Sequence, residues 1–375
     1  MNLHDDTRDD VGTRVTEQAR WHRGFRVLAV LLGLFLCTPG AGAVPPSGDQ
    51  PRRPGFREIW AYLMRGDEKE LTGKEPITAL CYFGASLNTE GRIPGAIARP
   101  TLPFGGGSKP AVFLVVAELS NFALMHFSLD PEYGVRSPLI GDICRLAEPF
   151  DGVQIDFEAV SRDDAEYFFG FLGELKAKLP AGKVLSVAVP ARMRQVSDAY
   201  DYTRIAPLVD GIVIMAYDEH WSGSPPGPVA SLAWCAKVAD YATSAIDKSK
   251  IVMGLPLYGR AWQDKKLATA LRYEAVQDLA ALKSSQTSYT SDLGAYFEYS
   301  ENVLVRVFYD DIRSLIEKLN LYVDRQISAV SFWRIGLGPP ELWTSIETVS
   351  STNAPAPVGG SWQTPPGRFP TIAPQ

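Results

Sequence analysis

Eight short apolar runs recur between residues 58 and 333, each followed by a polar or Gly/Pro break and then by a helical pattern. Strands that are buried on both faces and alternate with helices are typical of a parallel sheet. Eight such units in about 290 residues predict an α/β fold, a (β/α)8 TIM barrel, rather than an open doubly wound sheet. The runs are Glu58–Leu63, Ile77–Ala85, Val112–Leu119, Gly152–Phe157, Val184–Pro190, Gly211–Tyr217, Ile251–Leu257 and Ile327–Trp333.

The interval between the seventh and eighth runs is too long for a single helix. Residues 263–309 contain a helix-like segment, Tyr273–Leu282, and two strand-like segments, Ala295–Tyr299 and Val303–Phe308. We therefore expect a small α+β insertion between strands 7 and 8. Other intervals have apolar residues at helical spacing, in the segments Pro138–Leu146, Asp163–Leu179, Ser231–Ile246 and Asp311–Leu321.

The two ends of the chain differ in character from its middle. Basic residues precede the apolar run Val27–Cys37 and small residues follow it, as in a secretory signal peptide. Residues 1–43 are therefore predicted to be a signal peptide, with an uncleaved N-terminal anchor as the alternative. We expect a linker at 44–55, the barrel at 56–348 and a flexible Pro/Ser/Thr-rich tail at 349–375. This organisation predicts an exported protein (periplasmic, cell-envelope or secreted), with membrane association only through the N-terminal segment.

Composition limits the chemistry that the chain can carry out. Four Cys residues exclude a disulfide scaffold. Two of the four His residues lie in the leader, so only His126 and His220 remain, too few for a His-built metal site. The net charge is −6 and no segment concentrates Lys and Arg, which argues against nucleic-acid binding. We expect no metal or cofactor, and chemistry that depends on carboxylates, Tyr and Trp.

The fourth run ends in alternating polar residues. Gln154, Asp156 and Glu158 are separated by apolar residues, so on a strand they share one face. Polar side chains that point into a closed interior cost folding free energy unless they are hydrogen-bonded, and otherwise they indicate a functional role. Two adjacent carboxylates repel each other, which raises the pKa of at least one of them. We expect Glu158 to be a general acid with Asp156 behind it. The alternative is an edge strand with a solvated polar face.

Other strand ends carry polar and aromatic residues as well. Met215 and Tyr217 alternate to one face of the sixth run, and Asp218 follows at the rim. The phenol of Tyr217 can donate a hydrogen bond, although a Tyr-Asp pair after a strand often only anchors a loop. Aromatic faces stack on sugar rings, although each aromatic residue taken singly could serve core packing. Those near predicted strand ends are Trp60, Tyr62, Phe83, Trp221, Tyr258, Trp262 and Trp333.

Four motifs, in order along the core, resemble those of family 18 glycoside hydrolases. Residues 151–158 resemble the family's strand-four signature Asp-x-x-Asp-x-Asp-x-Glu, except that Gln154 stands where Asp is usual. With an amide at this position, the sequence resembles the branch of the family that contains spore-cortex and peptidoglycan N-acetylglucosaminidases. The other motifs are Met215-Ala-Tyr217-Asp218, Gly254-Leu-Pro256-Leu-Tyr258-Gly259-Arg260 and Trp333.

The resemblance implies roles for individual residues. Glu158 would protonate the glycosidic oxygen and later activate water, as in substrate-assisted retaining hydrolysis. Asp156 would orient the substrate 2-acetamido group and stabilise its positive charge, and Tyr217 would hydrogen-bond the same group. Because Gln154 cannot share a proton with Asp156, we expect a shifted pH optimum and modestly lower activity. The residues expected to contact substrate are Gln154, Met215, Asp218, Trp333, Tyr258, Arg260 and Tyr62.

These observations predict an exported retaining glycoside hydrolase that cleaves β-1,4 bonds of N-acetylglucosamine-containing glycans, foremost peptidoglycan or its fragments. A chitinase or an N-glycan endoglycosidase is the alternative within the same class. A catalytically silent carbohydrate-binding protein is the alternative from another class, although the presence of Glu158, Asp156 and Tyr217 favours an enzyme. The expected partner is the glycan, with no obligate protein partner.

Overall fold

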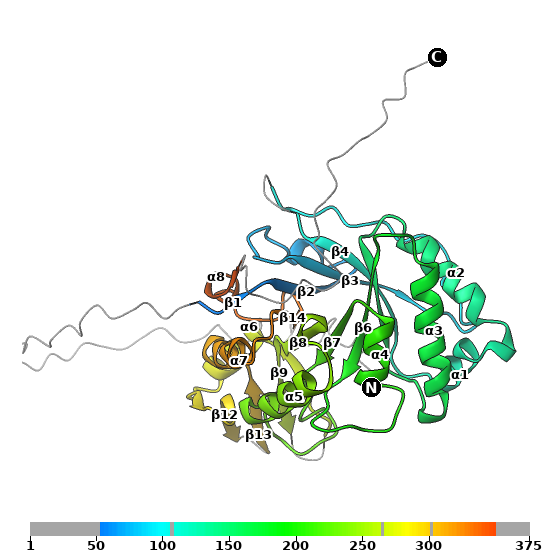
Figure 1. Ribbon diagram of the computed structural model, residues 1–375. Helices are drawn as coiled ribbons and strands as arrows, with labels where there is room; N and C mark the ends of the chain where they lie inside the picture. Colours follow the sequence, from blue (N-terminus) through cyan, green and yellow to red (C-terminus); the bar gives the residue numbers. More distant parts are fainter. Residues whose placement is uncertain (1–52, 106–108, 264–265, 301–302, 350–375) are drawn as a thin grey trace, which may run out of the picture. The chain divides into compact units, whose positions relative to one another are not determined.

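The computed structural model describes residues 53–105, 109–263, 266–300 and 303–349. Eight parallel strands close into a barrel in the order β14-β2-β3-β4-β5-β6-β7-β8 (Figure 1). Each strand lies at one of the predicted apolar runs, so the predicted barrel is confirmed. The strands are β2 (Glu58–Met64), β3 (Ala79–Ser86), β4 (Ala111–Glu118), β5 (Gly152–Phe157), β6 (Val184–Pro190), β7 (Gly211–Met215), β8 (Ile251–Pro256) and β14 (Ala329–Trp333).

Alternation along each strand divides the barrel core into two layers. On β5, Val153, Ile155 and Phe157 belong to the large apolar cluster between the strands and the surrounding helices. Gln154 and Asp156 take the alternate positions and therefore face the barrel interior. That interior is filled by a second apolar cluster, which includes Trp60, Tyr62, Cys81, Phe113 and Val115.

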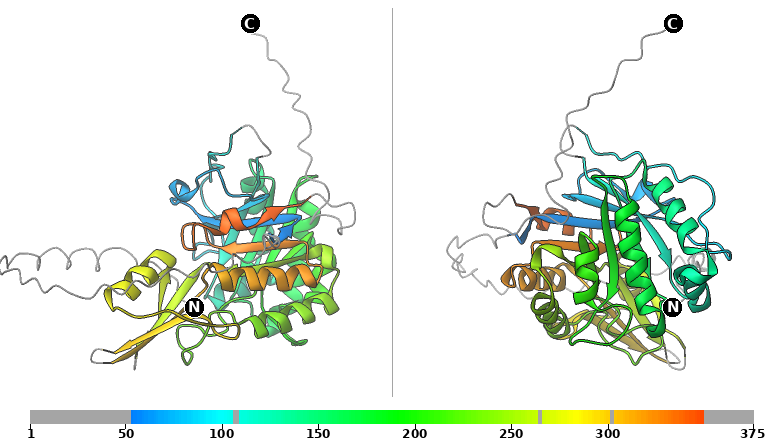
Figure 2. Two further views of the ribbon diagram at one scale, coloured as in Figure 1. Left: turned by 90° about the vertical axis from the view of Figure 1, so that its left-hand side faces the viewer. Right: turned by 45° about the vertical axis from the view of Figure 1, so that its right-hand side comes forward.

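Helices surround most of the barrel and confirm the predicted helical segments (Figure 2). Their apolar faces pack on the outer layer of the strands. The helices outside the insertion are α1 (Phe122–Leu129), α2 (Arg136–Ala147), α3 (Ala165–Lys178), α4 (Tyr202–Ile205), α5 (Leu232–Ala245), α7 (Ile312–Asp324) and α8 (Leu342–Ser345). Short 3-10 turns are η1 (Glu68–Glu70), η2 (Pro131–Tyr133), η3 (Arg162–Asp164), η4 (Ala206–Leu208) and η5 (Lys248–Lys250).

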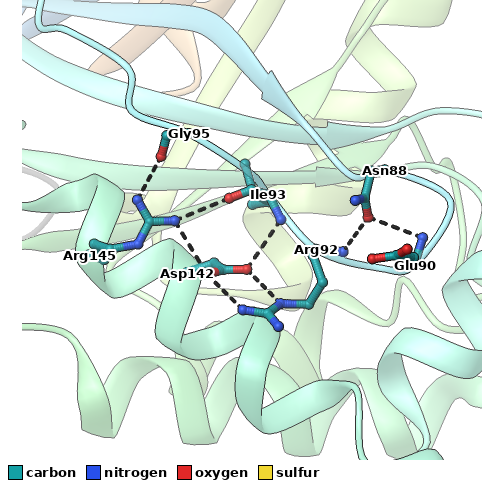
Figure 3. A network of polar contacts seen from close by, with 7 residues as sticks. All are labelled: Asn88, Glu90, Arg92, Ile93, Gly95, Asp142 and Arg145. Carbon is teal, nitrogen blue, oxygen red and sulfur yellow. Dashed lines mark hydrogen bonds and ion pairs between the residues drawn. The ribbon is translucent and has the colours of Figure 1, made fainter.

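The expectation of a helical pattern after every strand is wrong for the first two units. Their described residues contain no α-helix after β2 or β3, and η1 is the one helical turn there. The loop after β3 is instead fastened to α2 by hydrogen bonds (Figure 3). The carboxylate of Asp142 accepts from Arg92 Nε at 2.7 Å and from the backbone N–H of Ile93 at 3.2 Å. Arg145 donates to the carbonyls of Ile93 and Gly95.

The predicted insertion between barrel strands 7 and 8 is confirmed, but its first strand begins at Tyr258 instead of residue 263. It is a five-stranded antiparallel sheet in the order β10-β9-β13-β12-β11 with one helix, and it projects from the barrel in the left view of Figure 2. Val276, Phe297 and Val307 form part of its own small core. Its elements are β9 (Tyr258–Gln263), β10 (Thr269–Arg272), α6 (Tyr273–Leu282), β11 (Ser288–Thr290), β12 (Gly294–Ser300) and β13 (Leu304–Tyr309).

The two ends of the described core meet in a short parallel pair. Strand β1 (Gly55–Phe56) pairs with β15 (Glu347–Thr348). The predicted leader, most of the linker and nearly all of the tail lie outside the described residues. No helix within the described residues has the length and apolar character needed to cross a membrane. Cys81 and Cys235 are buried free thiols, and Cys144 is a partly buried one.

Candidate active site

The candidate site is at the carboxyl ends of the barrel strands, where the ends of β5, β7 and β14 meet. Asp156 is buried near the end of β5. Glu158 directly follows that strand and is exposed to solvent. Its backbone N–H donates to the carbonyl of Glu118 at 2.8 Å, which continues the pairing between β4 and β5 past the end of the strand. The arrangement therefore presents one buried and one accessible carboxyl group at the same edge.

Both carboxyl groups hold protons more tightly than ordinary acids do. Burial, reinforced by the charge of Glu158, raises the pKa of Asp156 well above its usual range. Although Glu158 has exposed surface, the surrounding protein partly desolvates its carboxyl group and so raises its pKa, and the charge of Asp218 adds to the effect. The Oδ1 atom of Asp156 has no hydrogen-bond partner within the described part of the chain. The pair thus places two carboxyl groups of raised pKa at one strand end, and Oδ1 of Asp156 can still accept a hydrogen bond.

Gln154 lies beneath this pair and has no exposed surface. Its Oε1 accepts a hydrogen bond from the phenol of Tyr62 at 2.5 Å, and its Nε2 donates to Ser186 Oγ at 3.3 Å. Burial raises the pKa of Tyr62 well above its ordinary value, so the phenol remains a donor. The amide of Gln154 is thus engaged away from Asp156, and both Gln154 and Tyr62 lie under the site rather than at its surface.

Tyr217 follows β7 and is half-buried, as is Met215 at the end of that strand. Burial raises the pKa of Tyr217 well above its ordinary value, and the charge of Asp156 is the next cause. The phenol therefore stays protonated beside the two carboxyl groups. Gly254 on β8 makes room for this ring, because a Cβ there would lie 2.8 Å from the carbonyl oxygen of Ile214 and 3.1 Å from Tyr217 Cε1.

Asp218 is held by two buried residues of the insertion. Its Oδ1 accepts from the phenol of Tyr258 at 2.7 Å, and from Nε and Nη2 of Arg260 at 3.0 Å and 2.7 Å. The backbone of Asp218 is left-handed, with φ of 58°, which the short side chain of Asp tolerates. Tyr258 and Arg260 are only 7% and 2% exposed, so they act on the site through Asp218.

An aromatic surface borders the site on the side of β14. Trp333 and Phe83 are both half-buried, and their ring centroids lie 5.3 Å apart. Tyr62 packs under Trp333 with a centroid distance of 5.2 Å. A half-buried indole at this place leaves a face on which a sugar ring can stack.

The other aromatic residues near predicted strand ends do not gather here. Trp60 is fully buried and packs edge-on against Phe113 at 5.0 Å within the barrel. Trp262 is buried in the insertion and donates from Nε1 to the carbonyl of Ser224 at 3.1 Å. Trp221, after β7, is 47% exposed. For Trp60 and Trp262 the structure therefore supports a packing role.

One residue near Glu158 had no signal in the sequence. The phenol of Tyr200, from the segment between β6 and α4, bonds the backbone on both sides of Glu158. No periodicity or motif singles out a tyrosine in that loop. The described residues also include no group of three or more His, Cys, Asp or Glu side chains that could hold a metal ion.

Comparison with known proteins agrees with this geometry. The sequence profile of "Glycosyl hydrolases family 18" matches residues 139–338. Putative sporulation-specific glycosylase YdhD of Bacillus subtilis is 33% identical over 219 residues, which cover 54% of this chain and 51% of the relative. The cortical fragment-lytic enzyme of Bacillus anthracis is 27% identical over 286 residues, or 71% of this chain and 66% of the relative. The chain thus spans about half to two thirds of the length of these curated relatives.

Solved structures share the fold. The Bacillus cereus spore cortex-lytic enzyme SleL superposes with a TM-score of 0.68 at 25% identity, over 80% of this chain and 76% of the other. A chitinase from Chromobacterium violaceum gives a TM-score of 0.67 at 23% identity, over 77% of this chain and 97% of the other. The second likeness bears on the fold alone.

Proposed function

Because the chain belongs to glycosyl hydrolases family 18, we propose that it is an exported retaining hydrolase that cleaves β-1,4 bonds of N-acetylglucosamine-containing glycans. The substrate we propose is peptidoglycan or its fragments. The observation that carries the proposal is the pair Asp156 and Glu158, two carboxyl groups with raised pKa beside the protonated phenol of Tyr217. Such a constellation suits acid catalysis without a metal.

In the proposed first step, Glu158 donates its proton to the glycosidic oxygen as that bond breaks. The carbonyl oxygen of the substrate's own 2-acetamido group attacks the anomeric carbon from the opposite face, so no enzyme carboxylate is the nucleophile. The nitrogen of the acetamido group becomes positively charged. This charge favours the ionised form of Asp156, whose carboxylate then stabilises it. The phenol of Tyr217 donates a hydrogen bond that orients the acetamido group.

In the second step, Glu158 is a carboxylate and removes a proton from water. This water attacks the anomeric carbon and displaces the acetamido oxygen, which regenerates the acid and leaves the original anomeric configuration. Asp218, held on one oxygen by Tyr258 and Arg260, and Met215 line the same pocket in this proposal. Trp333 provides its floor, while Gln154 and Tyr62 bond each other beneath the site.

The choice of peptidoglycan depends on two observations. The similar proteins YdhD and SleL carry names that refer to sporulation and spore cortex lysis, and the N-terminal sequence has the pattern of an export signal. The alternative substrates are chitin, because relatives named as chitinases also match, and N-glycans. A binding protein without catalysis is the alternative of another class, and the intact acid Glu158 speaks against it.

The test is product analysis by mass spectrometry with the full chain. Peptidoglycan fragments and chitin oligosaccharides are incubated separately with wild type, Glu158→Gln and Glu148→Gln. The last is the matched control, because Glu148 is an exposed glutamate that precedes the opposite end of β5. We expect fragments with reducing-end N-acetylglucosamine from peptidoglycan with wild type and the control, and none with Glu158→Gln.

Each other outcome changes the proposal in a defined way. Products from chitin alone would replace peptidoglycan as the substrate and keep the mechanism. Equal activity of Glu158→Gln and wild type would refute the role of Glu158 as the general acid. Absence of products from both glycans, together with retained glycan binding, would favour the binding protein.

A further inference from the structure

The position of Glu158 depends on a turn that directly follows β5. The preceding residue, Phe157, ends the strand, and Ala159 and Val160 after it are buried. Since the exposed Glu158 lies between these buried residues, the backbone from Phe157 to Val160 sets where its carboxyl group can lie. A contact that fixes the backbone of Phe157 and Val160 therefore also fixes the position of the Glu158 carboxyl group.

One phenol oxygen bonds both of these residues. The hydroxyl of Tyr200 donates to the carbonyl of Phe157 at 2.8 Å and accepts from the backbone N–H of Val160 at 3.1 Å. The two contacts straddle Glu158 and use both the donor and an acceptor of the phenol. They also satisfy a backbone carbonyl and an N–H that would otherwise be buried without partners.

Tyr200 is itself held firmly. It is 8% exposed, and its ring packs edge-on against Phe168 of α3 with a centroid distance of 6.1 Å. Its own backbone N–H donates to Asp198 Oδ1 at 2.9 Å, and Asp198 forms an ion pair with Arg192. The phenol thus reaches the turn from a loop that is fixed independently of it.

The far end of the same turn has a separate fastening. Ser161 Oγ donates to Asp164 Oδ2 at 2.7 Å, and Asp164 Oδ1 contacts His126 Nδ1 at 2.7 Å. Asp164 is 3% exposed. Loss of the Tyr200 hydroxyl would therefore loosen the part of the turn that carries Glu158 while this second fastening stays in place.

We propose that Tyr200 is a positioning residue, whose hydroxyl holds the carboxyl group of Glu158 at the place and in the surroundings that acid catalysis requires. The inference rests on the proposed function. A displacement of about 1 Å at a catalytic group is enough to reduce rates by roughly 100-fold. A loosened turn would also let the carboxyl group of Glu158 move further into solvent, away from its titratable neighbours Asp156, Asp218 and Tyr217.

The structure offers a matched control in Tyr202. It is 1% exposed, and its hydroxyl donates to the carbonyl of Pro190 at 2.7 Å, at the end of a neighbouring barrel strand. Tyr200→Phe and Tyr202→Phe each remove one buried hydroxyl that is bonded to the backbone. A merely structural role predicts the same consequences for both variants.

The test compares the two variants with wild type in three measurements on the full chain. The first is kcat and KM on the glycan that wild type cleaves. The second is the titration of the Glu158 side-chain carboxyl by 13C NMR, assigned by its absence in Glu158→Gln. The third is hydrogen exchange by mass spectrometry in the peptide that contains Glu158 and Val160.

For Tyr200→Phe we expect kcat to fall by about 10- to 100-fold with little change in KM. We also expect the Glu158 titration to move toward lower pH and exchange at Val160 to become faster. Tyr202→Phe should match wild type in all three. An unchanged Glu158 titration in Tyr200→Phe, or an equal loss of kcat in Tyr202→Phe, overturns the proposal. If wild type cleaves no glycan but the titration and exchange respond as expected, the proposed function fails and the positioning of Glu158 by Tyr200 stands.

Discussion

Replacement of Gln154 by aspartate tests how the buried amide governs the catalytic pair. The side chain of Gln154 has no exposed surface and bonds Tyr62 and Ser186. Gln154→Asp shortens the side chain by one methylene, removes the donor to Ser186 and adds a third carboxyl group to the face that carries Asp156 and Glu158. We expect a less stable protein whose activity depends differently on pH.

The size of the stability loss follows from these changes. Loss of one methylene from a packed interior costs about 1 kcal/mol, and loss of the hydrogen bond to Ser186 costs about 1 kcal/mol. Together they lower the free energy of unfolding by about 2 kcal/mol even when the new carboxyl group is protonated. Burial raises the pKa of the new carboxyl group in the folded state. An additional loss in the free energy of unfolding is therefore absent below the pKa of the unfolded state and grows as pH rises toward the pKa of the folded state.

The same substitution should extend catalysis to lower pH, although it lowers stability. Two carboxyl groups that share one proton titrate as a pair, with one apparent pKa lowered and the other raised. Asp156 would then carry charge at lower pH than it does beside the amide. We expect the acidic limb of kcat/KM to move down by about one pH unit, equivalent to roughly 1.4 kcal/mol.

The assay combines urea unfolding at pH 5 and pH 8 with pH–rate profiles for Gln154→Asp and for Gln154→Asn. The asparagine variant is the control, because it shortens the side chain equally and adds no charge. The difference between the two variants isolates the effect of the new acid. A pH–rate profile of Gln154→Asp that matches wild type, or a shift that Gln154→Asn reproduces, would refute the reasoning.

Three further predictions follow from other contacts. Arg260→Met should lower the free energy of unfolding by about 3 kcal/mol in urea denaturation, because the carboxylate of Asp218 loses both hydrogen bonds from Arg260 and keeps the one from Tyr258. Arg260→Lys should lower it by less. A loss below about 1 kcal/mol for Arg260→Met would contradict this prediction. Hydrogen bonding from Arg92 lowers the pKa of Asp142, so its stabilisation is full above the unfolded pKa and fades as pH falls through the lower folded pKa. Asp142→Asn should therefore cost about 1.5 kcal/mol at pH 7 and progressively less below pH 4 in urea titrations, whereas a constant difference would exclude this charge effect. Trp333→Ala should raise KM for the glycan that wild type cleaves about tenfold, while Trp333→Phe should retain most affinity. Equal KM values for both variants would show that no sugar stacks there.

The strands of the barrel could be predicted because each is a local pattern. The period of two in β5 identified Gln154 and Asp156 as inward-facing residues, and both are buried in the structure. The α+β insertion was also predictable, since the interval that contains it is too long for one helix. The missing helix after β3 was not predictable, because Asp142 fastens that loop by bonds to Arg92 and Ile93, which are 50 and 49 residues away.

The partners of the site residues were outside the reach of sequence reasoning. Arg260 was expected to meet the substrate, but it is buried and bonded to Asp218, which is 42 residues away. Tyr200 reaches Phe157 across 43 residues. Such pairs arise only when the barrel closes and brings loops from different strands to the same edge.

By itself, the sequence determined the eight strands, the faces of their side chains and the residue types available for acid chemistry, because these depend on local periodicity and composition. The tertiary structure alone decided which groups are desolvated and which are bonded. Desolvation raises the pKa of Asp156 and Glu158, and it depends on how completely distant segments cover a side chain. The raised pKa of the two carboxyl groups is therefore a property of the closed barrel.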